Sequence, residues 1–297
     1  RLKFSVPFIA MLMTDAAKFN RPEQLEVLSQ NFPKILTETK IDSGNLLHLL
    51  CDSAEKSVAL QIVLEAAYKE NHAQGGSISL FYNFVNSPER YEGLTPLLTA
   101  IYHNNLPAIS VLIDYGASIT LAKADDIMET PINVAIELGR VNIVDMLISY
   151  GQKLLPEKGA FAKFINGNTI GSSPMAMAMA MKNDRIAVTL VNAGARLDYT
   201  VSDTLTQMDI INALDNKNMH KSLTLVFAKA KDSMSSENYQ RFLTPSLHNS
   251  LKFNKRRLPI YLIKSGANYE TKSTPENMCA MEFAIIKGMN TVVDQII

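Results

Sequence analysis

Residues 93–119 read GLTPLLTAIYHNNLPAISVLIDYGASI, and this stretch decides the fold. Thr95 is suited to cap a helix because its hydroxyl can accept a hydrogen bond from an unpaired backbone amide, and Pro96 suits the first helical position. Asn104 and Asn105 interrupt the apolar pattern, and the second apolar helix is expected to end at Gly116 as a left-handed C-cap. Two short antiparallel helices cannot bury both apolar faces alone, so the stretch predicts neighbouring copies of itself.

Such copies occur along the chain. Thr130 follows Thr95 by 35 positions (130 − 95), and Gly151 follows Thr130 by the same 21 positions that separate Gly116 from Thr95. Two further copies begin at Ser173 and Pro245, and each spans 21 positions to its closing residue, Gly194 and Gly266 respectively. Two more degenerate copies begin at Thr206 and Met281.

The shared pattern of Thr-Pro-Leu-His-x-Ala, a turn, a second helix and Gly-Ala resembles the ankyrin repeat. The resemblance covers Gly93 to Ile297 closely and the preceding region less closely, where Asn45 to Leu50 (NLLHLL) matches only in part. It implies an all-α fold, an ankyrin-repeat solenoid of about six or seven stacked helix-turn-helix units with short hairpin loops.

The pattern predicts three parts. Residues 1–40 form a divergent N-terminal helical repeat or cap, and residues 41–92 form a degenerate ankyrin repeat plus an insertion. The repeats of residues 93–297 divide at about 93–127, 128–171, 172–204, 205–243, 244–277 and a truncated 278–297. The insertion at 152–172 is interpreted as an enlarged hairpin loop and not as a domain boundary. Because the last copy ends on apolar residues, we expect the natural protein to continue with at least a cap.

Composition excludes several classes of function. The 297 residues carry 29 basic and 29 acidic side chains, so the whole chain has no excess of positive charge for nucleic acid or an acidic membrane. No apolar run is long enough to span a bilayer, although Arg1 to Met13 could also be interpreted as a signal peptide. The basic segment Lys252 to Arg257 could contact phosphates or act as a localisation signal, but we interpret it as a solvated turn.

Catalytic and metal-binding motifs are missing from the sequence: no phosphate-binding loop, His-Glu-x-x-His, Cys-x-x-Cys or Gly-x-Ser-x-Gly is present. We therefore expect no catalytic residue, metal or cofactor. His48 and Cys51 lie three positions apart and could form a thiol nucleophile with its base. The favoured interpretation is structural, because His48 and His248 both match the histidine of the repeat pattern.

The resemblance also implies where a partner would bind, since ankyrin repeats recognise proteins through hairpin tips and the inner face of the first helices. By position, the predicted protein-binding residues are Tyr102, His103, Lys123, Asp125, Asp126, Glu129, Glu137, Leu138, Met181, Tyr199, Lys252 and Phe253. Asp198, Asp203, Leu214, Glu270 and Lys272 occupy equivalent positions. This mixture of aromatic and charged side chains is typical of a contact surface.

The sequence therefore predicts a non-catalytic protein–protein interaction module, cytoplasmic and monomeric, with a protein partner and neither nucleic acid nor membrane as ligand. Degenerate repeats with irregular insertions resemble ankyrin-bearing effectors that intracellular bacterial pathogens deliver into host cells, so a host cytosolic protein is our hypothesis for the partner. The alternative is that the array docks substrate for an enzyme whose catalytic domain lies outside this chain or in residues 1–92.

Overall fold

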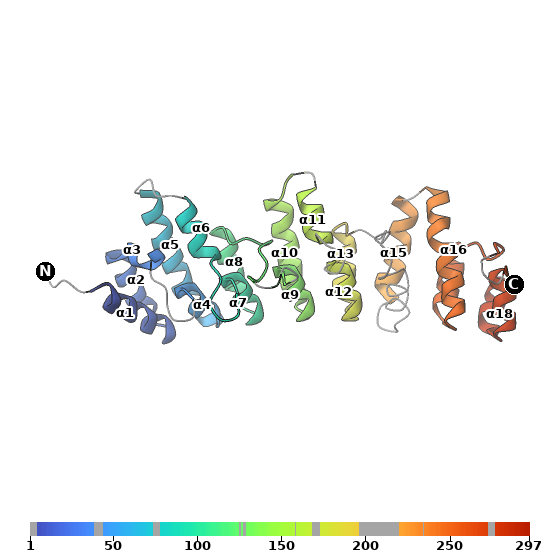
Figure 1. Ribbon diagram of the computed structural model, residues 1–297, viewed down its shortest axis with the longest axis horizontal. Helices are drawn as coiled ribbons and strands as arrows, with labels where there is room; N and C mark the ends of the chain where they lie inside the picture. The colour runs from blue at the N-terminus through green and yellow to red at the C-terminus, as the bar shows by residue number, and fades with distance from the viewer. Residues whose placement is uncertain are drawn as a thin grey trace. The chain divides into compact units, whose positions relative to one another are not determined.

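The computed structural model describes residues 5–38, 44–73, 78–124, 126, 129–157, 159–167, 173–195, 220–233, 235–272 and 277–297. All regular elements in these ranges are helices, as Figure 1 shows. The chain forms two compact units, residues 1–161 (unit 1) and residues 162–297 (unit 2).

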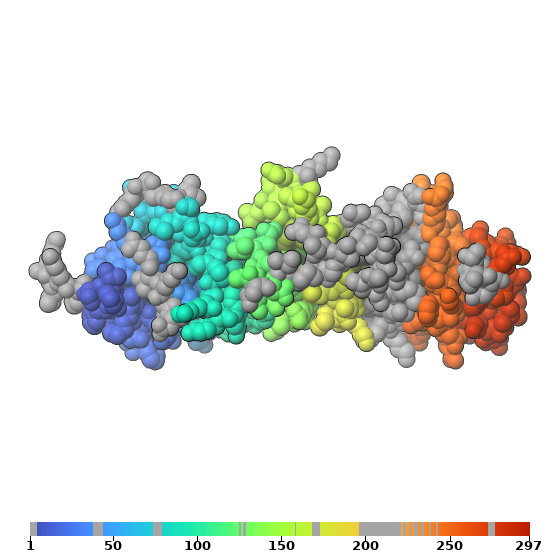
Figure 2. Space-filling view, viewed as in Figure 1, coloured from blue at the N-terminus to red at the C-terminus, as the bar shows by residue number. Residues whose placement is uncertain are grey.

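Unit 1 consists of helix pairs in which neighbouring pairs pack on one another. The pairs are α1 (Val6–Lys18) with α2 (Pro22–Asn31), α4 (Leu46–Cys51) with α5 (Ser57–Ala73), α7 (Pro96–Tyr102) with α8 (Leu106–Asp114), and α9 (Pro131–Glu137) with α10 (Val141–Leu154). The first helices α1, α4, α7 and α9 contact one another in that order, and α2, α5 and α8 form a second row. In Figure 2 the pairs abut from blue through cyan to green.

Three short elements complete unit 1. Helix α3 (Pro33–Glu38) follows α2, and the 3-10 turn η1 (Ala54–Lys56) joins α4 to α5. Helix α6 (Ile78–Asn86) lies in the aromatic-rich insertion and packs on α5 and α7. The insertion before the clearest repeat therefore adds a helix to the stack.

The apolar stripes inferred from the sequence form the core of unit 1. On α7 and α8 the side chains of Leu98, Ile101, Ile109 and Leu112 have no exposed surface. Burying each such side chain contributes roughly 1.5–3 kcal/mol, so the apolar contacts between pairs dominate the stability of the stack.

The turn inside each pair has one recurring geometry. One residue adopts a left-handed conformation, with φ of 48° at Asn20, 55° at Asn104 and 66° at Gly139. The next amide donates to a carbonyl five positions earlier, as the Asn105 amide does to the carbonyl of Ala100 at 2.9 Å. This Schellman arrangement pairs the carbonyls at the helix end while it reverses the chain.

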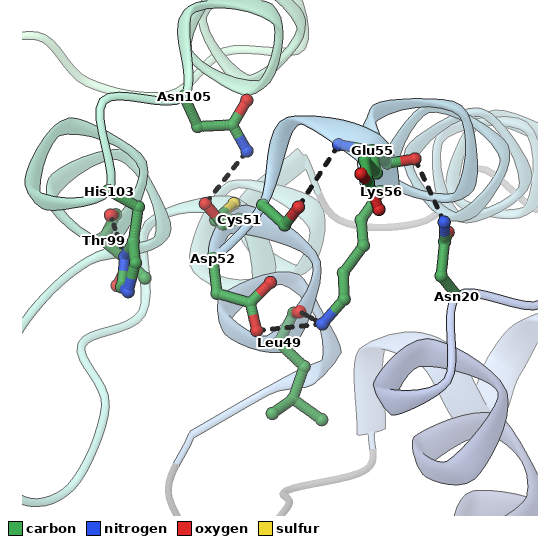
Figure 3. Close-up of polar contacts among 10 residues, drawn as sticks. Asn20, Leu49, Cys51, Asp52, Glu55, Lys56, Thr99, His103 and Asn105 are labelled. Atoms are coloured by element: carbon green, nitrogen blue, oxygen red, sulfur yellow. Dashed lines mark hydrogen bonds and ion pairs between the residues drawn. The ribbon is translucent and has the colours of Figure 1, made fainter.

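Polar side chains at these turns also connect neighbouring pairs (Figure 3). The Asn105 carboxamide caps α8 by accepting from the Ala108 amide at 3.1 Å, and its nitrogen donates to the Cys51 carbonyl at 3.0 Å. The Asn20 side chain donates to the Glu55 carbonyl at 3.3 Å. Each bond joins one pair to the next, so the turns fix the register of the stack.

His48 makes the same kind of connection from inside α4. Its Nδ1 accepts from the Asn45 amide at 3.2 Å, and its Nε2 donates to the Leu94 carbonyl at 2.9 Å, just ahead of α7. Burial lowers the pKa of His48, against smaller opposing effects of its backbone hydrogen bonds and Glu89. The neutral imidazole is therefore the form that the folded stack favours.

Unit 2 contains the pairs α12 (Pro174–Ala180) with α13 (Asp184–Asn192), α16 (Ser236–Lys252) with α17 (Leu258–Lys264), and α18 (Ala280–Ile286) with α19 (Asn290–Ile296). Helix α15 (His220–Ser233) packs on α13 and α16. Left-handed turn residues recur at Lys182, Asn254 and Gly288. Of the degenerate copy beginning at Thr206, residues 206–219 lie outside the described residues, and α15 is its second helix.

The expectation that Gly151 closes the second helix of its repeat, as Gly116 does, is wrong. Gly151 is buried inside α10, which continues to Leu154, so it is not a left-handed cap like Gly116. Gln-Lys-Leu follows Gly151, and these good helix formers extend the helix. The 152–172 segment is also more than a loop, because it contains α11 (Ala160–Asn166), and the division between the two units falls within it.

The predicted helix start at Pro245 is wrong as well. Pro245 lies inside α16, whose buried side chains Tyr239, Leu243, Leu247 and Leu251 recur every four residues across it. Burial of this continuous stripe outweighs the roughly 3 kcal/mol that an internal proline costs. His248 therefore lies in mid-helix beside the Thr244 carbonyl, and does not share the position of His48 at the start of α4.

The left-handed cap at Gly116 is confirmed, with φ of 92° and the Ala117 amide bonded to the Leu112 carbonyl at 2.9 Å. No atom lies within 4 Å of the position a Cβ would take, so only backbone strain opposes a side chain there. We expect Gly116→Val to lower the free energy of unfolding by about 1–3 kcal/mol in chemical denaturation. Gly116→Asn is the control, because Asn tolerates this conformation; equal losses in both variants would contradict the explanation.

The lowered pKa of His48 predicts a pH dependence of stability. The unfolded chain binds a proton on this residue near pH 6.5 but the folded chain resists it, so stability is complete above that pH and decreases as pH falls below it. Between pH 7.5 and pH 5 the melting temperature of the parent should fall more than that of His48→Gln, which lacks the titrating group. Parallel decreases in the two proteins would exclude His48 as the cause.

Candidate functional site

The structure brings together three of the predicted contact residues of unit 1. Tyr102 ends α7, and its hydroxyl donates to the Glu129 carboxylate at 3.1 Å. Lys123 Nζ lies 3.6 Å from the same carboxylate oxygen. We call Tyr102, Lys123 and Glu129 the tip cluster. Tyr102 belongs to one repeat and Glu129 directly precedes the N-cap of the next, so the cluster spans two repeats.

The hairpin that carries the cluster is closed by its own backbone. The Lys123 amide donates to the Glu129 carbonyl at 3.1 Å, and the Ala124 amide donates to the Gly93 carbonyl at 3.0 Å. The half-buried Asp126 lies within this hairpin and its amide donates to the Lys123 carbonyl. Asp125 lies outside the described residues. These backbone bonds hold Lys123 and Glu129 beside one another.

Acidic side chains surround Tyr102 of the tip cluster. Burial raises the pKa of Tyr102 to about 12, and the carboxylates of Glu129, Glu137 and Glu92 add to this effect. The phenol is consequently protonated at neutral pH and acts as a hydrogen-bond donor to Glu129. Tyr102 is still 36% exposed, so its ring remains accessible to a partner.

Exposed helix ends lie beside the cluster. His103 and Leu138 are the C-cap residues of α7 and α9, and Glu137 is the last residue of α9. All three are exposed, and His103 Nδ1 faces the Thr99 carbonyl at 2.9 Å (Figure 3). Each C-cap residue directly precedes the left-handed residue of its turn.

This turn position includes a residue that the sequence analysis missed. Phe19 is the C-cap of α1, directly before the left-handed Asn20, and 66% of its surface is exposed. The Arg21 guanidinium lies 5.4 Å from the centre of its ring. His103, which directly precedes Asn104, was predicted as a contact residue. The same reasoning applied to the residue before Asn20 would have identified Phe19.

In unit 2 the same turn position carries two other predicted residues. Met181 is the C-cap of α12 and Phe253 follows α16, and each is about half exposed, 49% and 50% respectively. Lys252 is exposed at the end of α16, and the exposed Glu270 and Lys272 follow α17. Tyr199, Asp198, Asp203 and Leu214 lie outside the described residues.

The basic segment from Lys252 to Arg257 forms the turn between α16 and α17. Asn254 takes the left-handed conformation there, and the exposed Arg256 and Arg257 lead directly into α17. This arrangement agrees with a solvated turn, which was the favoured interpretation of the sequence.

The His48 and Cys51 pair is not arranged for nucleophilic catalysis. The Cys51 side chain is completely buried, and burial raises the pKa of its thiol, which disfavours the reactive thiolate. Both ring nitrogens of His48 are engaged by Asn45 and Leu94. Across the described ranges, no group of three or more His, Cys, Asp or Glu side chains could hold a metal ion, and no helix is both long and apolar enough to cross a membrane.

Comparisons with known proteins bear on the segment that holds the tip cluster. Residues 70–158 match the family model for ankyrin repeats, described as three copies. Alpha-latrotoxin-Lh1a of Latrodectus hasselti is 28% identical over 132 residues, which cover 40% of this chain and 9% of the toxin, so the match spans only a small part of that relative. The chain also resembles the human ASB11 ankyrin repeat domain, with a TM-score of 0.48, 16% identity and coverage of 95% of this chain and 96% of that one.

The family match begins within α5 and ends after α10, so it includes the pairs α7–α8 and α9–α10, their left-handed residues Asn104 and Gly139, and the hairpin between the two pairs. The resemblance inferred from Thr95, Pro96 and Gly116 is confirmed for this segment. Residues 70–158 are ankyrin repeats, and the described residues have an all-α solenoid fold of stacked helix-turn-helix units joined by short hairpin loops.

Proposed function

We propose that the chain is a non-catalytic recognition module that binds a protein through the tip cluster and the exposed helix ends beside it. Ankyrin repeats are in general protein–protein interaction modules, and their fold is generally not catalytic. The observation that supports this surface is the Tyr102–Glu129–Lys123 cluster, which joins two repeats and leaves an aromatic ring accessible.

The chemistry of this surface suits a partner with hydrogen-bond donors and an apolar contact. Glu129 and Glu137 supply carboxylates, and Leu138, which directly follows Glu137, is 37% exposed. Tyrosine contributes a large contact area at a small entropic cost, which explains its frequency among the residues that dominate binding energy. Tyr102 is therefore the residue on which we expect binding to depend most.

Further proposals concern the identity of the partner and the cellular compartment in which the chain acts. We propose that the chain acts as a monomer in the cytoplasm and that its partner is a cytosolic protein of a host cell, into which the chain is delivered as an effector. Divergent repeats with irregular insertions support this proposal, as in the segments that contain α6 and α11.

The test is affinity capture from eukaryotic cytosol with the immobilised chain. The variant Tyr102→Ala, Leu138→Ala should lose a captured protein, because truncating a central contact residue costs roughly 2 kcal/mol or more, about 30-fold in affinity. The matched control is Tyr68→Ala, Leu154→Ala, which removes an exposed tyrosine and an exposed leucine elsewhere in unit 1. Equal capture by the parent and both variants would contradict the proposed surface.

A further inference from the structure

Two turns of unit 2 carry a surface of a different kind from the tip cluster. In the α16–α17 turn the cationic side chains of Lys252, Arg256 and Arg257 are exposed. Phe253 lies among them in the sequence and is 50% exposed. Neither this turn nor the α18–α19 turn (residues 286–290) contains an acidic residue, so both are basic although the charge of the whole chain is balanced.

The two turns occupy equivalent places in neighbouring helix pairs. Helix α16 contacts α18, and α17 contacts α19. In each pair the left-handed residue, Asn254 or Gly288, follows two positions after the last residue of the first helix. Equivalent turns of stacked repeats lie along one edge of the array, so Ile286, which is 68% exposed, and the exposed Lys287 extend the surface around Phe253. We define the turn patch as Lys252, Phe253, Arg256, Arg257, Ile286 and Lys287.

The cations of the turn patch are available to an external anion. Among the described residues, no carboxylate forms an ion pair with the side chains of Lys252, Arg256 or Arg257, and the ion pair on α16 joins Arg241 to Glu237 near the opposite end of that helix. Arg257 directly precedes α17 but makes no side-chain capping bond there. Charge complementarity therefore calls for an anionic partner.

The apolar members of the turn patch favour one class of anion. A nucleic acid would offer bases that stack on aromatic rings, which Ile286 cannot do. An acidic peptide would neutralise the cations but offers no continuous apolar phase to side chains on two separate turns. An anionic bilayer offers headgroup phosphates to the cations and an apolar boundary to aromatic and aliphatic side chains, so it matches both parts of the patch.

We propose that the turn patch docks the chain on an anionic lipid surface. Lys252, Arg256 and Arg257 lie at the headgroup phosphates, and the side chains of Phe253 and Ile286 enter the apolar boundary beneath them. Docking of this kind is peripheral, since side chains enter the interface and no helix crosses the bilayer. The tip cluster belongs to unit 1 and takes no part, so either surface can fail without the other.

The test is flotation of the full chain with phosphatidylcholine vesicles that contain about 30% phosphatidylserine, compared with vesicles of phosphatidylcholine alone. The chain should bind the anionic vesicles roughly tenfold more tightly, and added salt should weaken this binding because it screens the charges. Equal binding to both kinds of vesicle, or binding to neither, would overturn the proposal.

Charge variants distinguish the turn patch from general electrostatic attraction. Arg256→Gln, Arg257→Gln should weaken binding to the anionic vesicles roughly tenfold. The control Lys264→Gln, Lys272→Gln removes the same charge from exposed positions at and beyond the other end of α17, and it should change the affinity less than about twofold. An equal loss in the control would reduce the effect to net charge and overturn the site.

Apolar variants distinguish a lipid surface from other polyanions. Phe253→Ser, Ile286→Ser keeps every cation but should lower binding to the anionic vesicles severalfold, because less apolar surface enters the bilayer. The control Phe19→Ser, Ile297→Ser removes an exposed phenylalanine and an exposed isoleucine outside the turn patch and should bind like the parent.

Two results would assign the turn patch to a different partner. One is unchanged vesicle binding by Phe253→Ser, Ile286→Ser. The other is tighter binding of the parent to a fluorescein-labelled oligodeoxythymidylate or polyglutamate peptide than to the anionic vesicles. Either result would overturn the lipid proposal in favour of a nucleic acid or an acidic protein segment.

Discussion

The left-handed residue between the two helices of a pair is the constraint on which the structure depends. At Asn104 and Gly139 it lets the following amide bond a carbonyl five positions back, and the chain reverses within a few residues. Reversal over such a short distance forces the apolar stripes of the two helices onto one another. Because the same geometry recurs at Asn20, Lys182, Asn254 and Gly288, pairs with quite different sequences acquire similar shapes.

Burial of apolar side chains supplies most of the stability of this arrangement, but it is non-directional and would allow neighbouring pairs to slide. The buried polar side chains remove that freedom. His48 and Asn105 each satisfy a group in their own helix pair and another group in a neighbouring one. A displaced neighbour would leave these buried groups unpaired, which is costly. Register in unit 1 is thus set by a few polar bonds within an apolar stack.

The fold could be inferred from sequence where the signal is local. Thr95 and Gly116 indicate a helix start and a helix end from the few residues around them, and both were predicted correctly. Gly151 has the residue type of Gly116 and Pro245 that of Pro96, yet both were predicted wrongly, because an extended helix-forming sequence at Gly151 and a continuous buried stripe at Pro245 outweighed the local signal. Local sequence patterns indicate which backbone conformations a residue tolerates. Packing against the rest of the structure determines which of them it adopts.

The same distinction applies to the candidate binding surface. Tyr102 and Glu129 lie 27 positions apart, one at the end of a first helix and the other in a hairpin, and the ankyrin resemblance puts partner contacts at both kinds of position, so it could nominate both.

Four of the hydrogen bonds that join neighbouring elements in unit 1 share one further property: their acceptors are main-chain carbonyls, at Glu55 for Asn20, Leu94 for His48, Cys51 for Asn105 and Phe84 for Asn45. A carbonyl is present whatever side chain the residue carries. Mutation at the accepting position therefore leaves the bond available, and only the donor's identity is constrained. Such one-sided dependence lets one repeat diverge without a compensating change in its neighbour, which is how a stack can remain ordered while its repeats lose their mutual similarity.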